Sequence, residues 1–248
     1  MESGDGMKEK KGRISAVVLA AGQGKRMESG IQKQFMLLEE KPLIYYALKA
    51  FEESEADDVI LVTGKEEVEY CKEDIVKHFG FSKVRTVIAG GKERYHSVYE
   101  GLKAIQQLDS EDCRMVLIHD GARPFVTKKM IHSCIEGVEQ YRACVAGMPV
   151  KDTIKITDDE GFAKETPKRS SLWLVQTPQA FEYSLVKEAY DKMFSDIRYE
   201  KGVTDDAMVV ESMTDTKVKL IPGDYRNIKI TTPEDMILAE ALLKERGF

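Results

Sequence analysis

Apolar positions along this chain fall into short continuous runs that alternate with amphipathic stretches. The runs predict buried strands at 14–20, 58–63, 84–89, 114–119 and 143–148. Between them apolar residues keep helical spacing, as at Leu43, Ala47, Ala50 and Phe51. Regular alternation of strand and helix predicts an α/β fold with a mostly parallel central sheet flanked by helices.

The pattern changes after Met148. Residues 149–172 hold two short, polar, strand-like pieces around the turn Asp158-Asp159-Glu160-Gly161, with little apolar surface to bury. The residues alone favour equally a surface excursion and an arm that reaches another subunit. Further on, the pattern predicts a strand at 172–175, a helix at 182–193 and a strand at 217–221. A last helix is expected at Thr232-Pro233, with Thr232 as N-cap and Pro233 at the first helical position.

Length and composition bound the class of protein. The 248 residues contain no internal repeat and no linker, so we predict one domain over 14–248 after a disordered extension at 1–13. The net charge of −6 disfavours a nucleic-acid binder with a basic surface. Apolar runs reach about six residues, against roughly 20 for a membrane span. The cysteines and histidines lack zinc-site spacing, and free thiols predict a cytoplasmic protein: Cys71, Cys113, Cys134, Cys144.

The loop after the first predicted strand is the first candidate for ligand chemistry. Gly22 and Gly24 allow backbone N–H groups to approach a phosphate closely, and Lys25, Arg26 and later Lys33 add positive charge. The Walker A pattern fails because no glycine stands five positions before Gly24. The dinucleotide fingerprint fails as well, because its third glycine is missing. The loop therefore predicts a different kind of phosphate site.

Four later segments at predicted strand ends carry polar groups suited to the same ligand: 89–97, 119–125, 149–155 and 227–233. Gly90-Gly91 precedes Arg94 and Ser97, and Asp120 ends a strand before Arg123. Carboxyl ends of parallel strands meet at one edge of a sheet, which brings these groups together. Asp120 is a candidate ligand for Mg²⁺ or for a substrate hydroxyl, and Arg123 a candidate phosphate ligand. His119 is expected to be a packed histidine rather than a catalyst, and Lys229 lies among β-branched residues, which is unusual unless it reaches a site.

Together these segments resemble the cytidylyltransferases, and among them the 2-C-methyl-D-erythritol 4-phosphate cytidylyltransferases of the non-mevalonate isoprenoid pathway. The similarity runs in order along nearly the whole chain after residue 13. It rests on these segments: 19–27 (LAAGQGKRM), 33–35 (KQF), 90–97 (GGKERYHS), 119–125 (HDGARPF), 149–153 (PVKDT), 172–173 (LW), 176–181 (QTPQAF), 204–206 (TDD) and 227–231 (NIKIT).

The resemblance implies a Rossmann-like nucleotidyltransferase fold, CTP as a substrate, Mg²⁺, and a homodimer with exchanged β-arms at about 149–172. By motif, Arg26 and Lys33 would stabilise the transition state, and Arg169 and Lys229 would position the sugar-alcohol phosphate. The cytidine nucleotide would be lined by Ala20, Ala21, Gly22, Gly24, Gly90, Gly91, Ser97 and Gly121. The site would be completed by Asp120, Arg123, Thr153, Thr177 and Thr204, with Asp120 as the metal ligand.

The chain differs from the family pattern at two positions, and two alternative functions compete with the one that the resemblance implies. Gln32 stands where the family usually has proline, and Lys92 where an acid is common. A ribitol 5-phosphate cytidylyltransferase shares several motifs, but Ala20-Ala21-Gly22 and Leu172-Trp173 favour methylerythritol phosphate. A non-catalytic nucleotide-binding regulator on this fold is the other rival. The retained cations speak against it, because a mere binder has no need of them.

Overall fold

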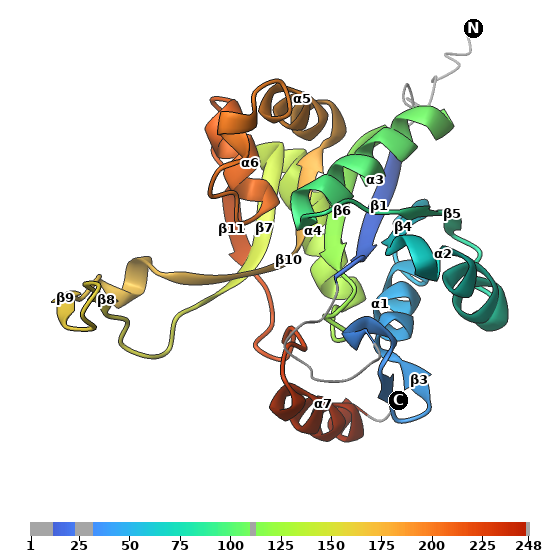
Figure 1. The fold of residues 1–248 in the computed structure, drawn as a ribbon, viewed down its shortest axis with the longest axis horizontal. Helices are drawn as coiled ribbons and strands as arrows, with labels where there is room; N and C mark the ends of the chain where they lie inside the picture. Colours follow the sequence, from blue (N-terminus) through green and yellow to red (C-terminus); the bar gives the residue numbers. More distant parts are fainter. Residues whose placement is uncertain (1–11, 23–31, 110–112, 247–248) are drawn as a thin grey trace, which may run out of the picture.

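The computed structural model describes residues 12–22, 32–109 and 113–246; residues 1–11, 23–31, 110–112 and 247–248 lie outside the described part (Figure 1). The strands predicted in the first half of the chain are confirmed within one residue at each end. They are β1 (Arg13–Ala20), β4 (Asp58–Thr63), β5 (Val84–Ala89), β6 (Cys113–Asp120) and β7 (Ala143–Pro149). Arg13, expected in the N-terminal extension, is instead the first residue of β1 and forms an ion pair with Asp58.

These strands join two others in one seven-stranded sheet with the order β11-β7-β10-β6-β1-β4-β5. β10 (Trp173–Glu182) runs antiparallel to β6 and β7, whereas the other neighbouring pairs are parallel. The sheet is therefore mixed but mostly parallel, as predicted. β11 (Lys219–Pro222) forms one edge of the sheet.

Helices cover both faces of this sheet (Figure 1). Along β1, Ala16, Val18 and Ala20 pack against α1 (Leu43–Glu52) and α4 (Lys128–Tyr141) in one cluster. Val17 belongs to the opposite cluster, formed with α3 (Arg94–Asp109), α5 (Tyr183–Met193) and α6 (Asp206–Met213). Alternate side chains of a strand point to opposite faces, so a continuous apolar run gives a strand buried on both sides.

A third, smaller apolar cluster lies beside the main body. In this cluster Leu38, from the short hairpin of β2 (Leu37–Leu38) and β3 (Lys41–Pro42), joins Leu243 of α7 (Pro233–Arg246). The helix begins at Pro233, as predicted, and Asp235 accepts the backbone N–H of Thr232 at 2.9 Å. None of the helices described is both long and apolar enough to span a bilayer.

The second half of the chain departs from the prediction in several elements. The strand expected at 172–175 corresponds to the start of β10. This strand continues through residues 176–181 to Glu182, so α5 begins at Tyr183. β11 begins two residues later than expected. The helix α6 was not predicted. In the first half of the chain, the helical segment from α2 (Val68–Tyr70) through the π-helical residues Cys71–Lys77 was not predicted either.

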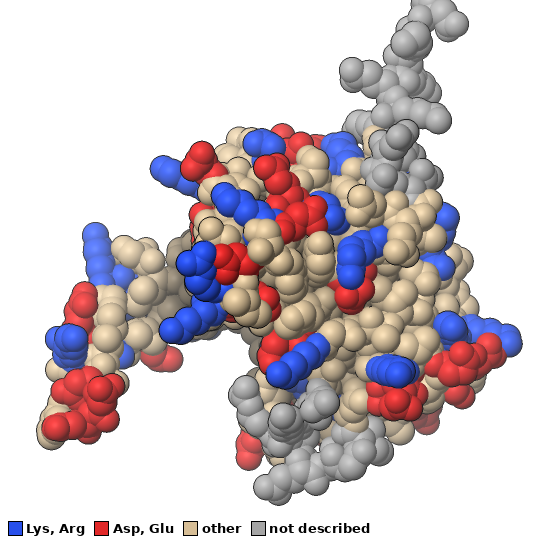
Figure 2. All heavy atoms as spheres, turned by 45° about the horizontal axis from the view of Figure 1, so that its top comes forward, with Lys and Arg blue, Asp and Glu red and all other residues tan. Residues whose placement is uncertain are grey.

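Residues 150–172 form an arm that projects from the body (Figure 1). Its tip is the short hairpin β8 (Ile156–Thr157) and β9 (Ala163–Glu165), with the predicted turn between them. Within the arm Pro167 and Leu172 are partly buried, whereas Phe162 is 68% exposed. Figure 2 shows acidic and basic side chains along it. Most residues of the arm are therefore exposed in the single chain.

Candidate active site

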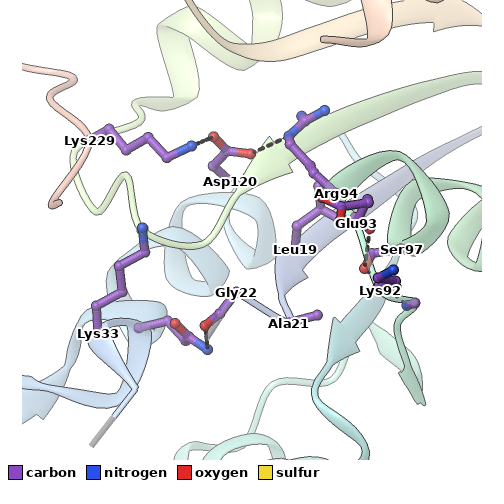
Figure 3. A pocket seen from close by; sticks show the side chains of 13 residues that line it. Leu19, Ala21, Gly22, Lys33, Lys92, Glu93, Arg94, Ser97, Asp120 and Lys229 are labelled. Atoms are coloured by element: carbon purple, nitrogen blue, oxygen red, sulfur yellow. Dashed lines mark hydrogen bonds and ion pairs between the residues drawn. The ribbon is translucent and has the colours of Figure 1, made fainter. Parts of the chain in front are cut away.

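A pocket of about 560 Å³ lies where β1 and β6 end. Lys33 and Lys229 lie on one side of it, Lys92 and Ser97 on the other, with Gly22 between them (Figure 3). The remaining lining residues are Leu19, Ala21, Gln34, Gly91, Glu93, Arg94, Asp120 and Ala122. The sequence prediction that segments following several strands meet at one edge of the sheet is confirmed.

The loop after β1 supplies the floor of the pocket. Ala21 and Gly22 line it, whereas Ala20 lies behind it as the last residue of β1. The buried Gln34 side chain donates to the carbonyl oxygens of Ala20 and Gly22, which fixes the path of the loop. Gly24 and Arg26 lie outside the described residues. Lys33 opens the 3-10 turn Lys33–Phe35, and this turn carries its side chain to the pocket.

The second glycine loop packs tightly against the first. A Cβ at Gly90 would lie 2.5 Å from Ser97 Oγ and 2.8 Å from Ala21 Cβ, so only glycine fits there. The Gly91 N–H donates to Ser97 Oγ at 3.1 Å. Gly91 and Ser97 line the pocket, but Gly90 does not.

Asp120, the last residue of β6, binds two cations at once. Its Oδ2 accepts from Lys229 Nζ at 2.7 Å and its Oδ1 from Arg94 Nε at 3.0 Å. Burial alone would raise the pKa of this carboxyl, but Arg94 and Lys229 outweigh burial and hold the pKa well below its usual range. Asp120 therefore remains a carboxylate that fixes Lys229 at the pocket wall.

Behind Asp120 lies a hydrogen-bonded group that does not touch the pocket. Thr177 Oγ1 accepts from the Asp120 N–H at 3.1 Å and lies 2.9 Å from His119 Nδ1. His119 Nε2 lies 3.1 Å from the Arg123 carbonyl oxygen. Burial lowers the pKa of His119 to about 4, so the ring is neutral, with its proton on Nε2 and Nδ1 accepting from Thr177. His119 is a packed residue, as predicted.

Among the described residues that line the pocket, the carboxylates are Asp120 and Glu93. Within the described ranges no three His, Cys, Asp or Glu side chains gather in a way that could hold a metal ion. Both oxygens of Asp120 already accept from cations. Mg²⁺ in nucleotide enzymes is held by few carboxylates and mainly by phosphate oxygens, so this geometry favours Asp120 as the anchor of Lys229.

Several predicted site residues lie elsewhere in the single chain. Arg123 donates to the Asn227 carbonyl oxygen at 2.8 Å and so holds the segment that carries Lys229. Gly121 packs against Leu19 and Ile44, where a Cβ would lie 2.4 Å from Ile44 Cδ1. Gly121 and Arg123, like Thr177, are outside the residues that line the pocket. The exposed residues Thr153, Arg169 and Thr204 are also outside that lining.

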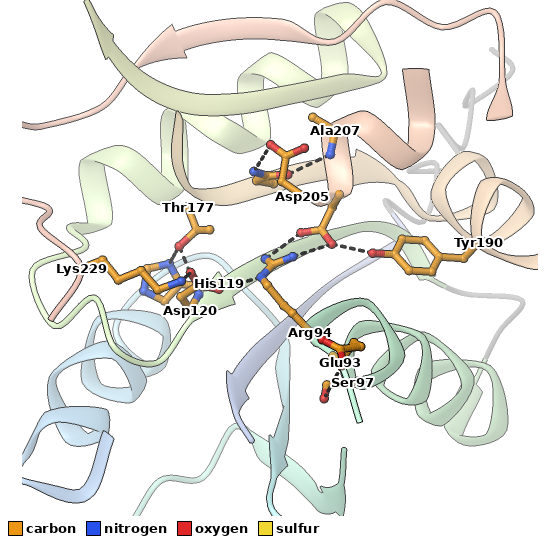
Figure 4. Close-up of polar contacts among 12 residues, drawn as sticks. Glu93, Arg94, Ser97, His119, Asp120, Thr177, Tyr190, Asp205, Ala207 and Lys229 are labelled. Carbon is orange, nitrogen blue, oxygen red and sulfur yellow. Dashed lines mark hydrogen bonds and ion pairs between the residues drawn. The ribbon is translucent and has the colours of Figure 1, made fainter. Parts of the chain in front are cut away.

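Two contributors were missed as parts of the site. Arg94, noted only as a donor, forms two bonds to Asp206 at 2.9 and 2.8 Å besides its bond to Asp120 (Figure 4). Gln34 is the second contributor, because its side chain donates to the backbone of the loop after β1. Gln34 directly follows Lys33, so the sequence could have indicated that it lies beside the site. The ion pair of Arg94 with Asp206 could not be seen in the sequence, because the two residues are 112 positions apart.

The fold and the pocket define a nucleotide-binding α/β enzyme of the nucleotidyltransferase class, with Lys33 and Lys229 at one end of the pocket and Gly91, Lys92 and Ser97 at the other. Residues 14–245 match the family model for 2-C-methyl-D-erythritol 4-phosphate cytidylyltransferase. The chain belongs to this family.

Relatives and solved structures agree with this assignment. A 2-C-methyl-D-erythritol 4-phosphate cytidylyltransferase of Lachnoclostridium phytofermentans is 50% identical over 234 residues, covering 94% of this chain and 97% of the relative. One from Lachnospira eligens is 51% identical over 231 residues, covering 93% and 99%. The crystal structure of 4-diphosphocytidyl-2C-methyl-D-erythritol synthase from Anaerococcus prevotii matches with a TM-score of 0.81 at 34% identity, covering 94% and 97%.

Proposed function

We propose that this enzyme transfers CMP from CTP to 2-C-methyl-D-erythritol 4-phosphate. A phosphate oxygen of the sugar alcohol attacks the α-phosphorus of CTP in line. The new P–O bond forms as the bond to the leaving pyrophosphate breaks, giving 4-diphosphocytidyl-2-C-methyl-D-erythritol. The observation that carries the proposal is the pocket itself, with Lys33 and Lys229 facing one end and Gly91 and Ser97 the other.

The chemistry needs positioned charge rather than a protein nucleophile. Negative charge gathers on the equatorial oxygens of the α-phosphate as the bonds exchange, and fixed cations stabilise it. Lys33 serves that role, and family motif assigns the same role to Arg26. Lys229, held by Asp120 at 2.7 Å, positions the attacking phosphate. The attacking group is already an anion, so it requires no strong general base.

Mg²⁺ belongs to this proposal as an ion held by the triphosphate. It would neutralise phosphate charge and favour departure of pyrophosphate. The two ion pairs of Asp120 support this arrangement over direct ligation by the protein.

The arm extends the proposal to a homodimer. Thr153 and Arg169 belong to the active site by motif, but in one chain they lie on an exposed arm, where Arg169 donates to the Lys151 carbonyl oxygen at 3.1 Å. Exposed Ile154, Ile156 and Phe162 give the arm apolar surface suited to a second copy. Each arm then crosses to the partner and completes its site.

The free cysteines support a cytoplasmic setting.

The test is a substrate panel read by pyrophosphate release. We expect turnover with CTP and 2-C-methyl-D-erythritol 4-phosphate, and little with ribitol 5-phosphate. ATP and GTP should turn over poorly, because the pocket end at Gly91 and Ser97 suits a pyrimidine. Faster turnover with ribitol 5-phosphate would favour the first rival function. Nucleotide binding without pyrophosphate release would favour the regulator.

A further inference from the structure

A line of charged and polar side chains leads from the pocket into the core between α3, α5 and α6 (Figure 4). It runs from Lys229 to Asp120, then to Arg94, Asp206 and Tyr190. The Tyr190 hydroxyl donates to Asp206 Oδ1 at 2.6 Å. Lys229, Asp120 and Arg94 line the pocket, whereas Asp206 and Tyr190 do not. The inner end of the line is therefore out of reach of the substrate.

Asp206 is the most firmly held member of the line. Its side chain is fully buried, and it is the first residue of α6. Asp205 caps this helix by accepting the Met208 N–H at 2.9 Å. Gln179 of β10 ties the cap to the sheet, because its amide donates to Asp205 and accepts the Ala207 N–H. The sheet itself thus fixes the position of the Asp206 carboxylate.

The guanidinium of Arg94 transmits this position to the pocket. Both terminal nitrogens donate to Asp206, and Nε donates to Asp120. A guanidinium is planar and rigid, so holding its two terminal nitrogens also sets the direction of Nε. Without the Asp206 charge, Arg94 would be a largely enclosed cation with a single carboxylate partner and would be free to turn. Asp120 would then lose one of the two bonds that orient it toward Lys229.

We propose that Asp206, supported by Tyr190, is a positioning residue that holds Arg94 and thereby fixes Asp120 and Lys229 for phosphate transfer. The proposal rests on the proposed function only for its kinetic readout. Asp206 touches neither substrate. Its role is to keep the Lys229 amino group in one place while charge develops at the α-phosphorus.

The kinetic test uses Asp206→Asn, which keeps the shape and removes the charge. Misplacement of a catalytic group by about 1 Å typically costs on the order of 10²-fold in rate. We expect a loss in kcat of that order with a nearly unchanged KM for CTP. Tyr190→Phe, which removes one hydrogen bond and keeps the packing, should lose only a few-fold. Asp191→Asn on α5 removes an exposed ion pair with Lys187 and should leave kcat unchanged.

A double-mutant comparison separates positioning from simple stabilisation. In a Lys229→Met background, Asp206→Asn should cost almost nothing further in kcat, because the group that it positions is gone. An equal fold loss in both backgrounds would overturn the proposal. So would a lowered Tm with an unchanged kcat in Asp206→Asn.

A second readout needs no turnover. In the free protein, the rate at which an amine-reactive reagent labels Lys229, followed by mass spectrometry, should rise several-fold in Asp206→Asn, while labelling of Lys103 stays the same. An unchanged Lys229 rate would contradict the positioning role even if the enzyme used other substrates. Absence of turnover in the wild type, with the labelling change present, would instead count against the proposed function alone.

Discussion

At the scale of single residues, the pocket wall depends on the buried carboxylate of Asp120 and its two cationic partners. A buried carboxylate is costly unless cations and hydrogen bonds surround it. Asp120 meets this condition with Arg94 on one oxygen and Lys229 on the other. The side chain of Lys229 remains about one third exposed, so it can contact a phosphate while its ion pair with Asp120 stays in place.

Lys33 should act on charge that develops during the reaction. Loss of one donor to such charge typically lowers the rate by roughly 10²–10³-fold. We therefore expect Lys33→Ala to lower kcat by this factor and to raise KM for CTP far less. Lys65→Ala, on an exposed turn outside the pocket, is the matched control. A near-normal kcat with a strongly raised KM would assign Lys33 to substrate binding instead.

His119 should make folding stability fall in mild acid. Burial lowers its pKa to about 4 from an ordinary 6.5, so the folded state takes up the proton less readily than the unfolded chain. Its stabilising contribution is complete above pH 6.5 and is lost as the pH falls towards 4, at about 1.4 kcal/mol per pH unit. Urea unfolding from pH 7.5 to 4.5 should show a steeper loss in the wild type than in His119→Gln. Parallel curves for the two proteins would refute this expectation.

At the scale of elements, close approach between helix and sheet sets the position of the glycine loop. Gly91 lies just before α3, Ser97 lies in its first turn, and the helix packs on β1 at Gly101. A Cβ at Gly101 would lie 2.6 Å from Val17 Cγ1. The absence of a side chain at this point lets the helix come close enough to bring its first turn to the pocket.

Gly101→Val should therefore destabilise the fold. Inserting extra atoms into a packed core typically costs about 1–3 kcal/mol. Gln106→Val on the same helix is exposed, so it reports the cost of a β-branched residue without a clash. Free energies of unfolding in urea should differ between the two variants by at least ~1 kcal/mol. Equal values would mean that Val17 moves aside without cost.

Element prediction succeeded where burial dictates composition. β1 and β4 are covered on both faces, so their sequences are continuous apolar runs that read as strands. The rest of β10, beyond the strand predicted at 172–175, was missed. Residues 176–179 are three polar side chains and a proline, held in place by neighbours from distant parts of the chain. The segments of the site that follow strands were predictable, whereas the link from Arg94 to Asp206 depends on a fold that no local pattern encodes.

At the scale of the whole molecule, the arm and the pocket belong to one site only if two copies combine. The described pocket includes no residue of the arm, although family motif assigns Thr153 and Arg169 to the site. A symmetric dimer would contain two such composite sites. The central claim is therefore that the pocket of one chain works with the arm of the other.

The most direct test is co-expression of Lys33→Ala and Arg169→Ala chains with different tags. If the arms cross, a mixed dimer has one doubly damaged site and one intact site. Random pairing makes about half of the dimers mixed, so the mixture should regain roughly a quarter of wild-type pyrophosphate release. Purification on both tags in turn should raise this to about half. Activity no higher than that of the separate variants, in dimers confirmed to carry both tags, would show that each arm serves its own chain.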